Sequence, residues 1–240
     1  MSGWKAFAAV AVVAGVCGAA QAAVSFGDFE DNTTDGFGSL GNSGVVAWST
    51  PVAGNVITAP AGSGTMTGSK VLELTGSTSF NFGQASGAAL GYDFLAGNHR
   101  ADFLANNTIE FDWFPPPNGG SGGFSQLYNI ILNSQGGGFT NVDGYGSGNA
   151  NDNQFYFTGY TGNLHHIVVN YTSYKNAILA SANPDGGTYL QFGIQPNAGS
   201  GAPADMYFDN FQLTTTPEPA SLGLMAVAGL AAMSRRRRQA

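Results

Sequence analysis

Cysteine and charged residues, which build many functional sites, are scarce in this sequence. A single cysteine in 240 residues excludes an internal disulfide framework and a zinc cluster built on thiolates. Charged residues make up only 10% of the chain, against roughly 25% in an ordinary soluble domain. Aromatic residues reach 12%, which argues against intrinsic disorder because such a chain can bury a core. The composition, with 36 glycines, therefore indicates a folded chain that is rich in turns.

A helical period is also missing between residues 23 and 216. Short alternating or aromatic-rich runs take its place, separated by clusters of Gly, Asn, Ser and Pro that favour turns. The runs are Val24–Glu30, Val45–Ser49, Lys70–Thr75, Thr78–Phe82, Thr108–Phe114, Phe124–Asn133, Gln154–Tyr160, Leu164–Tyr171, Gly187–Gln195 and Asp205–Leu213. We therefore expect an all-β domain in which two antiparallel sheets form a jelly-roll or lectin-like sandwich.

Alternation within these runs predicts which side chains fill the core. The strand expected over Thr108–Phe114 places Ile109, Phe111 and Trp113 on one face, because side chains alternate along a strand. The strand expected over Gly187–Gln195 alternates in the same way, with its two glutamines on the outer face.

The longest loop that we expect is the glycine-rich stretch 136–153. Loops at the ends of a sandwich often carry the binding residues. Tyr145 lies in this stretch and is the residue that we expect to stack on a sugar ring.

The N-terminal residues have the three parts of a secretory signal. Lys5 supplies a positive charge, and residues 6–16 form an apolar run too short to span a bilayer as a permanent helix. Ala20 and Ala22 give the small-x-small pattern that signal peptidase reads, with cleavage before Ala23. Residues 1–22 are therefore predicted to be a signal peptide.

The C-terminal residues combine a short motif, an apolar run and a basic cluster. The motif is Pro217, Glu218 and Pro219, the apolar run covers 220–233, and the cluster is Arg235, Arg236, Arg237 and Arg238. As a helix, the 14 apolar residues would cover about 21 Å, less than a hydrocarbon core of about 30 Å. The four arginines would hold their end of the segment in the cytoplasm.

This arrangement resembles the PEP-CTERM sorting signal of exopolysaccharide-producing Gram-negative bacteria. The resemblance implies that an exosortase, a membrane cysteine protease, cuts near residues 217–219 and releases or re-anchors the protein. The protein would then be anchored transiently in the inner membrane before it reaches the cell surface or the medium. An ordinary tail anchor and a basic tail for nucleic acid are the alternatives.

The chain thus divides into a signal peptide over 1–22, a β-sandwich over 23–213, and a linker with the sorting signal over 214–240.

Removal of both ends leaves a strongly acidic body. Residues 23–216 contain 14 acidic residues and three basic ones, a formal net charge of −11. Such a surface repels phosphate backbones, which excludes nucleic acid as a partner. Divalent cations and neutral or basic polysaccharides suit it better.

Acidic residues on the first and last predicted strands indicate a metal site. Asp28 and Glu30 lie on one side of the first strand, and Asp209 lies between aromatic residues in the last. These two strands resemble those of carbohydrate-binding-module jelly rolls, in which the first and last strands lie side by side and share a structural calcium. An ionised Asp209 is costly to bury without a partner, and calcium bound by hard oxygen ligands would supply one. Solvated or hydrogen-bonded carboxylates at a sheet edge are the alternative.

A second acidic pair, Glu110 and Asp112, resembles the metal-bearing strand of legume-type lectins and the catalytic strand of laminarinase-like glycosidases. The glycosidase pattern requires another Glu at the position that Pro115 occupies. We therefore expect Glu110 and Asp112 to be a pair on the exposed face of a strand.

His165 and His166 point to opposite faces of their strand, so they cannot readily share a metal ion. We expect one of these imidazoles at the surface and the other half-buried.

We therefore predict an exported, exosortase-sorted protein of the cell surface or extracellular matrix, without catalytic residues, that binds extracellular polysaccharide. Export and sorting follow from the two ends, whereas the matrix role is implied by the resemblance. An extracellular glycoside hydrolase or lyase is one alternative, and a structural surface protein without a ligand is another.

Overall fold

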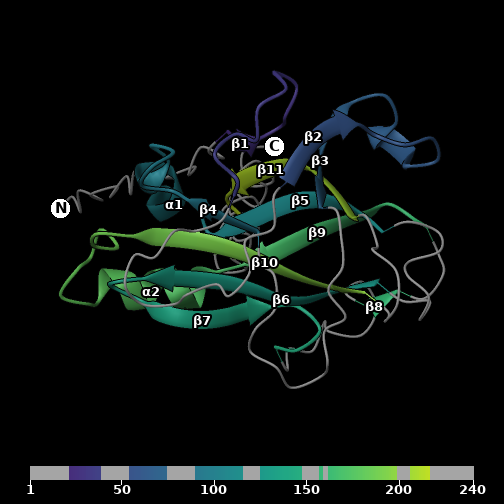
Figure 1. Cartoon of the computed structure of the whole chain (residues 1–240). Helices are drawn as coiled ribbons and strands as arrows, with labels where there is room; N and C mark the ends of the chain where they lie inside the picture. The colour runs from purple at the N-terminus through teal and green to yellow at the C-terminus, as the bar shows by residue number, and fades with distance from the viewer. Residues whose placement is uncertain are drawn as a thin grey trace, which may run out of the picture. The chain divides into compact units, whose positions relative to one another are not determined.

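Two antiparallel sheets face each other in a computed structural model of the chain (Figure 1). The structure describes residues 22–38, 54–74, 90–115, 125–147, 157–158, 162–198 and 206–216. Side chains from both sheets meet in one buried cluster, and the described residues from Ala22 to Thr215 belong to one compact unit. The all-β sandwich predicted from the sequence is confirmed.

The first sheet has six strands in the order β2, β3, β11, β5, β9, with β1 paired to β11. Their bounds are Val24–Gly27 for β1, Gly54–Thr58 for β2, Lys70–Leu74 for β3, Thr108–Phe114 for β5, His165–Asn170 for β9 and Met206–Thr214 for β11. The strand predicted over Thr108–Phe114 is confirmed residue for residue, and its alternation buries Ile109, Phe111 and Trp113 completely. The first and last strands do lie side by side, with Val24 opposite Leu213.

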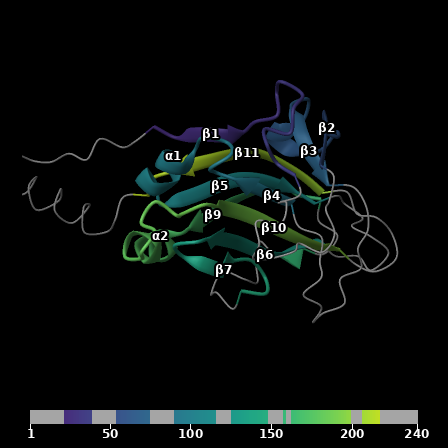
Figure 2. The same ribbon diagram turned by 60° about the vertical axis from the view of Figure 1, so that its left-hand side comes forward.

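The second sheet has five strands in the order β4, β10, β6, β7, with β8 paired to β6. Their bounds are Leu90–Asp93 for β4, Ser125–Ser134 for β6, Gly138–Asp143 for β7, Phe157–Thr158 for β8 and Leu190–Ala198 for β10. β10 lies in the middle, between β4 and β6, and turns Leu190, Phe192 and Ile194 into the core. Figure 2 shows β10, β6 and β7 together on the side of the sandwich away from β1 and β11.

Aromatic rings hold the two sheets together. Phe211 on β11 lies 4.5 Å from Phe37, 5.0 Å from Phe111 and 6.1 Å from Phe192 of the opposite sheet, as measured between ring centroids. Truncating a buried ring of this kind to alanine typically costs about 3–5 kcal/mol. The aromatic content of the sequence therefore goes largely into the core, as expected for Trp113.

Two short helices contradict the expectation of no helix. α1 covers Arg100–Ala105 and α2 covers Thr172–Leu179, both at the same end of the sandwich in Figures 1 and 2; a 3-10 turn covers Gly64–Met66. The rings of Phe103 and Tyr171 stack at 4.3 Å, and the Tyr171 hydroxyl donates to the Phe103 carbonyl at 2.8 Å. Tertiary packing thus stabilises helices that are too short to show a period of their own.

The structure also contains strands that were not predicted from the sequence. β7 occupies the first half of the stretch predicted as a loop over 136–153, where it forms a hairpin with β6. β2 and β4 were not predicted either, and each has only four or five residues. Four predicted segments lie outside the described residues: the strands Val45–Ser49 and Thr78–Phe82, the signal peptide apart from Ala22, and the C-terminal helix.

Candidate functional site

β11 changes its neighbour halfway along its length, and the predicted acidic residues lie at this point. Its first residues pair with β3, and its last residues pair with β1. Pairing with β5 on the other side is interrupted between Asp209 and Gln212. Asn210, within this bulge, has a positive φ of 56°, a conformation that asparagine tolerates better than most residues. The bulge turns polar side chains toward the outer face of the six-stranded sheet.

Asp209 is buried at this bulge, with 3% of its surface exposed. Its Oδ1 accepts a hydrogen bond from the Asn210 amide at 2.8 Å. Burial, and after it the charges of Asp112, Glu30 and Asp28, raise the pKa of Asp209 to about 7, although that hydrogen bond opposes the shift. The three residues predicted as a calcium site therefore lie close enough to interact electrostatically.

Asp28 and Glu30, by contrast, are exposed, and carboxylates in their loop bond to backbone amides. Glu30 Oε1 accepts from the Lys70 amide at 3.0 Å, and Asp35 Oδ2 accepts from the amides of Asp28 and Phe29 at 2.9 Å each. In the part of the chain that the structure describes, no three His, Cys, Asp or Glu side chains gather so as to hold a metal ion. Calcium at Asp28, Glu30 and Asp209 therefore stays a prediction.

A second polar cluster lies across β5 and β9 on the same outer face. Asp112 Oδ1 lies 2.8 Å from His166 Nδ1, and Asp112 Oδ2 accepts from Asn210 Nδ2 at 2.8 Å. Glu110 lies 3.4 Å from His166 Nε2 and accepts a hydrogen bond from the Thr214 hydroxyl. Asp112 is more buried than the exposed pair that the sequence predicted, because the side chains of His166 and Asn210 bond to it.

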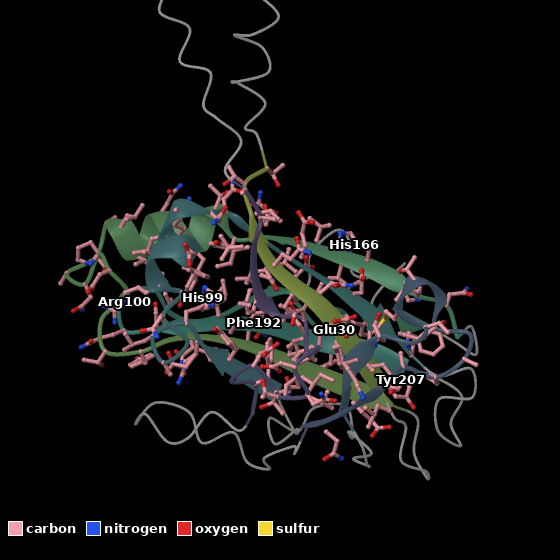
Figure 3. All side chains as sticks on the ribbon, turned by 90° about the horizontal axis from the view of Figure 1, so that it is seen from above. Glu30, His99, Arg100, His166, Phe192 and Tyr207 are labelled. Carbon is pink, nitrogen blue, oxygen red and sulfur yellow. The ribbon has the colours of Figure 1, made fainter. Side chains whose placement is uncertain are left out.

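The two adjacent histidines have opposite environments, as predicted. His165 lies against Trp113 with ring centroids 5.3 Å apart and the rings tilted by 33°, and burial lowers the pKa of His165 below its ordinary value. Burial alone would lower the pKa of His166 too, but hydrogen bonds and charges from Asp112 and then Glu110 raise it above the ordinary value. Figure 3 shows His166 on the β9 side of β11, and His99 and Arg100 on the other side.

The outer face of the five-stranded sheet carries side-chain amides instead of charges. Asn133 on β6 lies opposite Gln191 on β10, and its Nδ2 donates to Gln191 Oε1 at 3.0 Å. Four residues further along the same strands, Asn129 donates to Gln195 in the same way. Within the described residues, the Oδ1 atoms of Asn129 and Asn133 are buried without a hydrogen-bond partner. These two oxygens can still accept hydrogen bonds.

An exposed ring flanks this amide row. Phe139 on β7 lies directly opposite Asn133, so both side chains point to the same face. Phe139 is 47% exposed, whereas Asn133 is 1% exposed. An exposed ring beside unpaired amide oxygens suits a ligand that has both C–H faces and hydroxyl donors. Phe139 was not predicted as a binding residue, because the glycines that precede it read as a loop.

Tyr145, the predicted stacking residue, follows β7. Its side chain is half-buried and packs against the core cluster, and its amide donates to the Leu127 carbonyl at 2.9 Å. Stacking of a sugar ring on Tyr145 stays a prediction.

Two cavities open among the described residues. One, of about 410 Å³, lies between β7 and α2 and has an uncharged lining that includes Asn141, Asn170 and Ser173. The other, of about 320 Å³, lies between β1 and the turn that follows β4 and is lined partly by Asp28 and Asp35. Their contrasting linings favour a neutral ligand in the first and a cationic one in the second.

No curated protein matches the sequence. Several solved structures are similar in fold at low identity. A carbohydrate-binding module specific for non-crystalline cellulose, CBM28, is 18% identical over 81% of this chain and 96% of its own, with a TM-score of 0.46. The CBM22-1 xylan-binding domain of Paenibacillus barcinonensis Xyn10C is 16% identical over 82% and 95%, with a TM-score of 0.41. A cyclase from Fischerella sp. TAU is 19% identical over 82% and 98%, with a TM-score of 0.42.

The C-terminal residues match a family model. The model of the PEP-CTERM protein-sorting motif matches residues 215–238, which begin directly after β11. This confirms the resemblance drawn from Pro217, Glu218, Pro219 and the four arginines, a pattern that marks a protein for exosortase processing. No helix in the described ranges is long and apolar enough to cross a membrane, and the motif lies outside them apart from its first two residues. The chain carries a PEP-CTERM protein-sorting motif at its C-terminal end.

Proposed function

We propose that the protein is exported, sorted through its C-terminal motif to the cell surface or extracellular matrix, and binds neutral polysaccharide there without cleaving it. The observation that carries the binding role is the buried, unpaired Oδ1 of Asn133 beside the exposed ring of Phe139. Signal peptidase would cleave before Ala23, and exosortase would cut near residues 217–219. The β-sandwich between the two cleavage sites would be the part of the protein that binds polysaccharide.

The chemistry of the amide row supports a neutral, hydroxyl-rich ligand. A buried acceptor without a partner costs roughly 1–3 kcal/mol. A sugar hydroxyl that donates to the Asn133 Oδ1 atom, once the side chains that cover it move aside, would recover that energy. Phe139 offers a flat apolar surface for the C–H face of a sugar ring. The body's net charge of −11 disfavours anionic polymers.

The absence of cleavage is part of the proposal and is supported by how Glu110 and Asp112 are engaged. Both carboxylates bind side chains of their own sheet, namely His166, Asn210 and Thr214. A glycosidase would need two carboxyl groups free to face a glycosidic bond from either side.

Calcium between Asp28, Glu30 and Asp209 is a further part of the proposal. A divalent ion would offset the burial of the Asp209 carboxylate and, after it, the repulsion from neighbouring carboxylates, which together raise the pKa of Asp209. The exported protein should then melt at a higher temperature in calcium than in chelator. Equal melting temperatures would leave these carboxylates without an ion.

The binding role is tested with the exported protein against a panel of soluble polysaccharides, including the producer's own matrix, with and without calcium. We expect binding to at least one neutral polymer and no increase in reducing ends after long incubation. Released oligosaccharides would favour the hydrolase or lyase instead. Lack of binding to every polymer would favour a structural surface protein.

A further inference from the structure

The open edge between the two sheets contains a cavity of about 320 Å³ that is separate from the amide row. Its walls come from β1, from the loop after β1, from β4, and from the turn that joins β4 to α1. Asp28 and Asp35 line one side, and Tyr92, Gly97 and His99 line the other. In Figure 3, His99 lies beside β1 and α1. The volume is at the lower end of the range for ligand pockets, about 300–1,000 Å³.

The charge around this cavity is negative. Beyond the two lining carboxylates, Asp93 and Asp102 are close enough to affect the pKa of Tyr92. Asp102 lies 3.0 Å from His99 Nδ1. The described residues include two lysines and one arginine, and all three donate hydrogen bonds outside the cavity: Arg100 to Asp185, Lys70 to Thr58, and Lys175 to Asn106. The cavity is therefore suited to a cation.

Tyr92 gives a second, independent sign of a ligand. Its side chain lines the cavity although only 2% of the residue is exposed. Within the described residues its hydroxyl has no hydrogen-bond partner, whereas the buried hydroxyls of Tyr171 and Tyr174 are both hydrogen-bonded. A side chain at Gly97 would overlap the Tyr92 hydroxyl, so the glycine leaves this hydroxyl its place in the wall. Burial, and then the charges of Asp35, Asp93 and Asp102, raise the pKa of Tyr92 to about 12, so the hydroxyl remains a donor.

We propose that this cavity binds the protonated amine of an amino sugar, with the ammonium group at Asp28 and Asp35 and a sugar hydroxyl at Tyr92. An ammonium group has three donors and would gain charge-assisted hydrogen bonds from the carboxylates. Ser25, also in the lining, offers a further hydroxyl. The choice of a sugar over another amine rests on the proposed polysaccharide-binding function, but the residues are different from those of the amide row.

The test uses the exported protein and two tetrasaccharides, one of β-1,4-linked glucosamine and one of its N-acetylated form, in calorimetric titrations at low salt. Chelator is present, because calcium at Asp28 would compete with the ammonium group for the same carboxylate. Only the first carries ammonium groups, and only it should bind in this cavity. Asp28→Asn and Tyr92→Phe should each weaken this binding at least about fivefold, since each removes one ligand contact. Asp28 suits this purpose because its side chain makes only a 3.4 Å contact with the Glu30 amide.

The matched control is Asp31→Asn. It makes the same change of charge in the same loop, but Asp31 does not line the cavity and its carboxylate bonds to Thr33. This variant should bind within about twofold of the parent protein. An equal loss in all three variants would reduce the effect to net charge or loop order and overturn the proposal, as would equal binding of both tetrasaccharides.

Two further arms separate this proposal from the proposed function. A lysine tetrapeptide that binds as tightly as the amino sugar would overturn the assignment to a sugar. Phe139→Ala should leave the amino-sugar affinity unchanged while it weakens binding of neutral polysaccharide. Loss of both by this single substitution would mean that no separate site exists.

Discussion

The two outer faces of the sandwich both carry polar side chains between buried ones, but they differ in how completely these polar groups are hydrogen-bonded. On the six-stranded sheet, Asp112, Glu110 and His166 satisfy one another across neighbouring strands. On the five-stranded sheet, the amides pair across strands and still leave the Oδ1 atoms of Asn129 and Asn133 unpaired. Charged groups in a partly buried setting must be compensated within the fold. Neutral amides can be left incomplete at smaller cost, and for this reason we place ligand binding on the amide face.

The largest effect that we expect comes from removing the buried charge on the six-stranded sheet. Asp209→Asn keeps the shape and the hydrogen bond from the Asn210 amide but cannot ionise. The pKa of Asp209 rises from 3.8 to about 7 on folding, so the wild-type protein loses stability as pH increases from about 4 to about 7. Above that range, in chelator, the variant should be more stable by up to about 4 kcal/mol.

Urea unfolding at pH 5 and pH 8 measures this difference. The gap between variant and wild type should widen at pH 8. A variant that is less stable than the wild type at both pH values would contradict the assigned environment of Asp209.

A smaller effect separates the two faces directly. Phe139 and Val168 are similarly exposed, at 47% and 48%, on opposite sheets. Phe139→Ala should weaken binding of a neutral polysaccharide about tenfold, equivalent to about 1.4 kcal/mol, because the stacking surface is lost. Val168→Ala, the matched control, should leave the affinity unchanged. Isothermal titration gives both values, and equal losses would remove the distinction between the faces.

Asn133→Leu tests the unpaired acceptor itself. It removes the unpaired Oδ1 atom, which stabilises the fold, and it also removes the hydrogen bond to Gln191, which destabilises it. Because the two effects have opposite signs, the stability should change by no more than about 1 kcal/mol. Binding of the polysaccharide should fall by about tenfold. If stability collapses while the affinity of the remaining folded protein is retained, the amide row is structural.

The smallest effect concerns protonation on the charged face. The pKa of His166 should lie above 6.5 and that of His165 below it. His166 therefore stabilises the fold fully below pH 6.5, and this contribution is lost as pH rises through its own higher pKa. Asp112→Asn should lower the pKa of His166 and leave that of His165 in place. Titration of the ring protons by NMR gives both pKa values. A lower pKa for His166 than for His165 would contradict the assigned cluster of Asp112, Glu110 and His166.

Periodicity predicted the long strands well because their alternation is regular. Thr108–Phe114 reads as a strand from its own side chains, and the burial of Trp113 follows from it. The helix over Thr172–Leu179 does not read as one, because it depends on Tyr174 and Ile178 packing against the sandwich. β7 was hidden by the glycines before it, and its edge position gives only one buried residue, Asp143.

The site was predicted in part for the same reason. Asp28, Glu30 and Asp209 could be placed together because the first and last strands were expected to be neighbours. The pairing of Asn133 with Gln191 depends on the register between β6 and β10, which no local pattern specifies. The bulge at Asn210, which brings the side-chain amide of this residue to Asp112, likewise depends on contacts between distant strands.

The most direct test of the central claim is to map the ligand by NMR on the exported protein. When a neutral polysaccharide that binds is added, the side-chain amide signals of Asn129, Asn133 and Gln191 should shift, together with the ring of Phe139. The ring of His166 should stay unchanged. Shifts confined to His166 and its neighbours, or to Asn141 and Ser173 in the cavity between β7 and α2, would contradict the assignment of binding to the amide face.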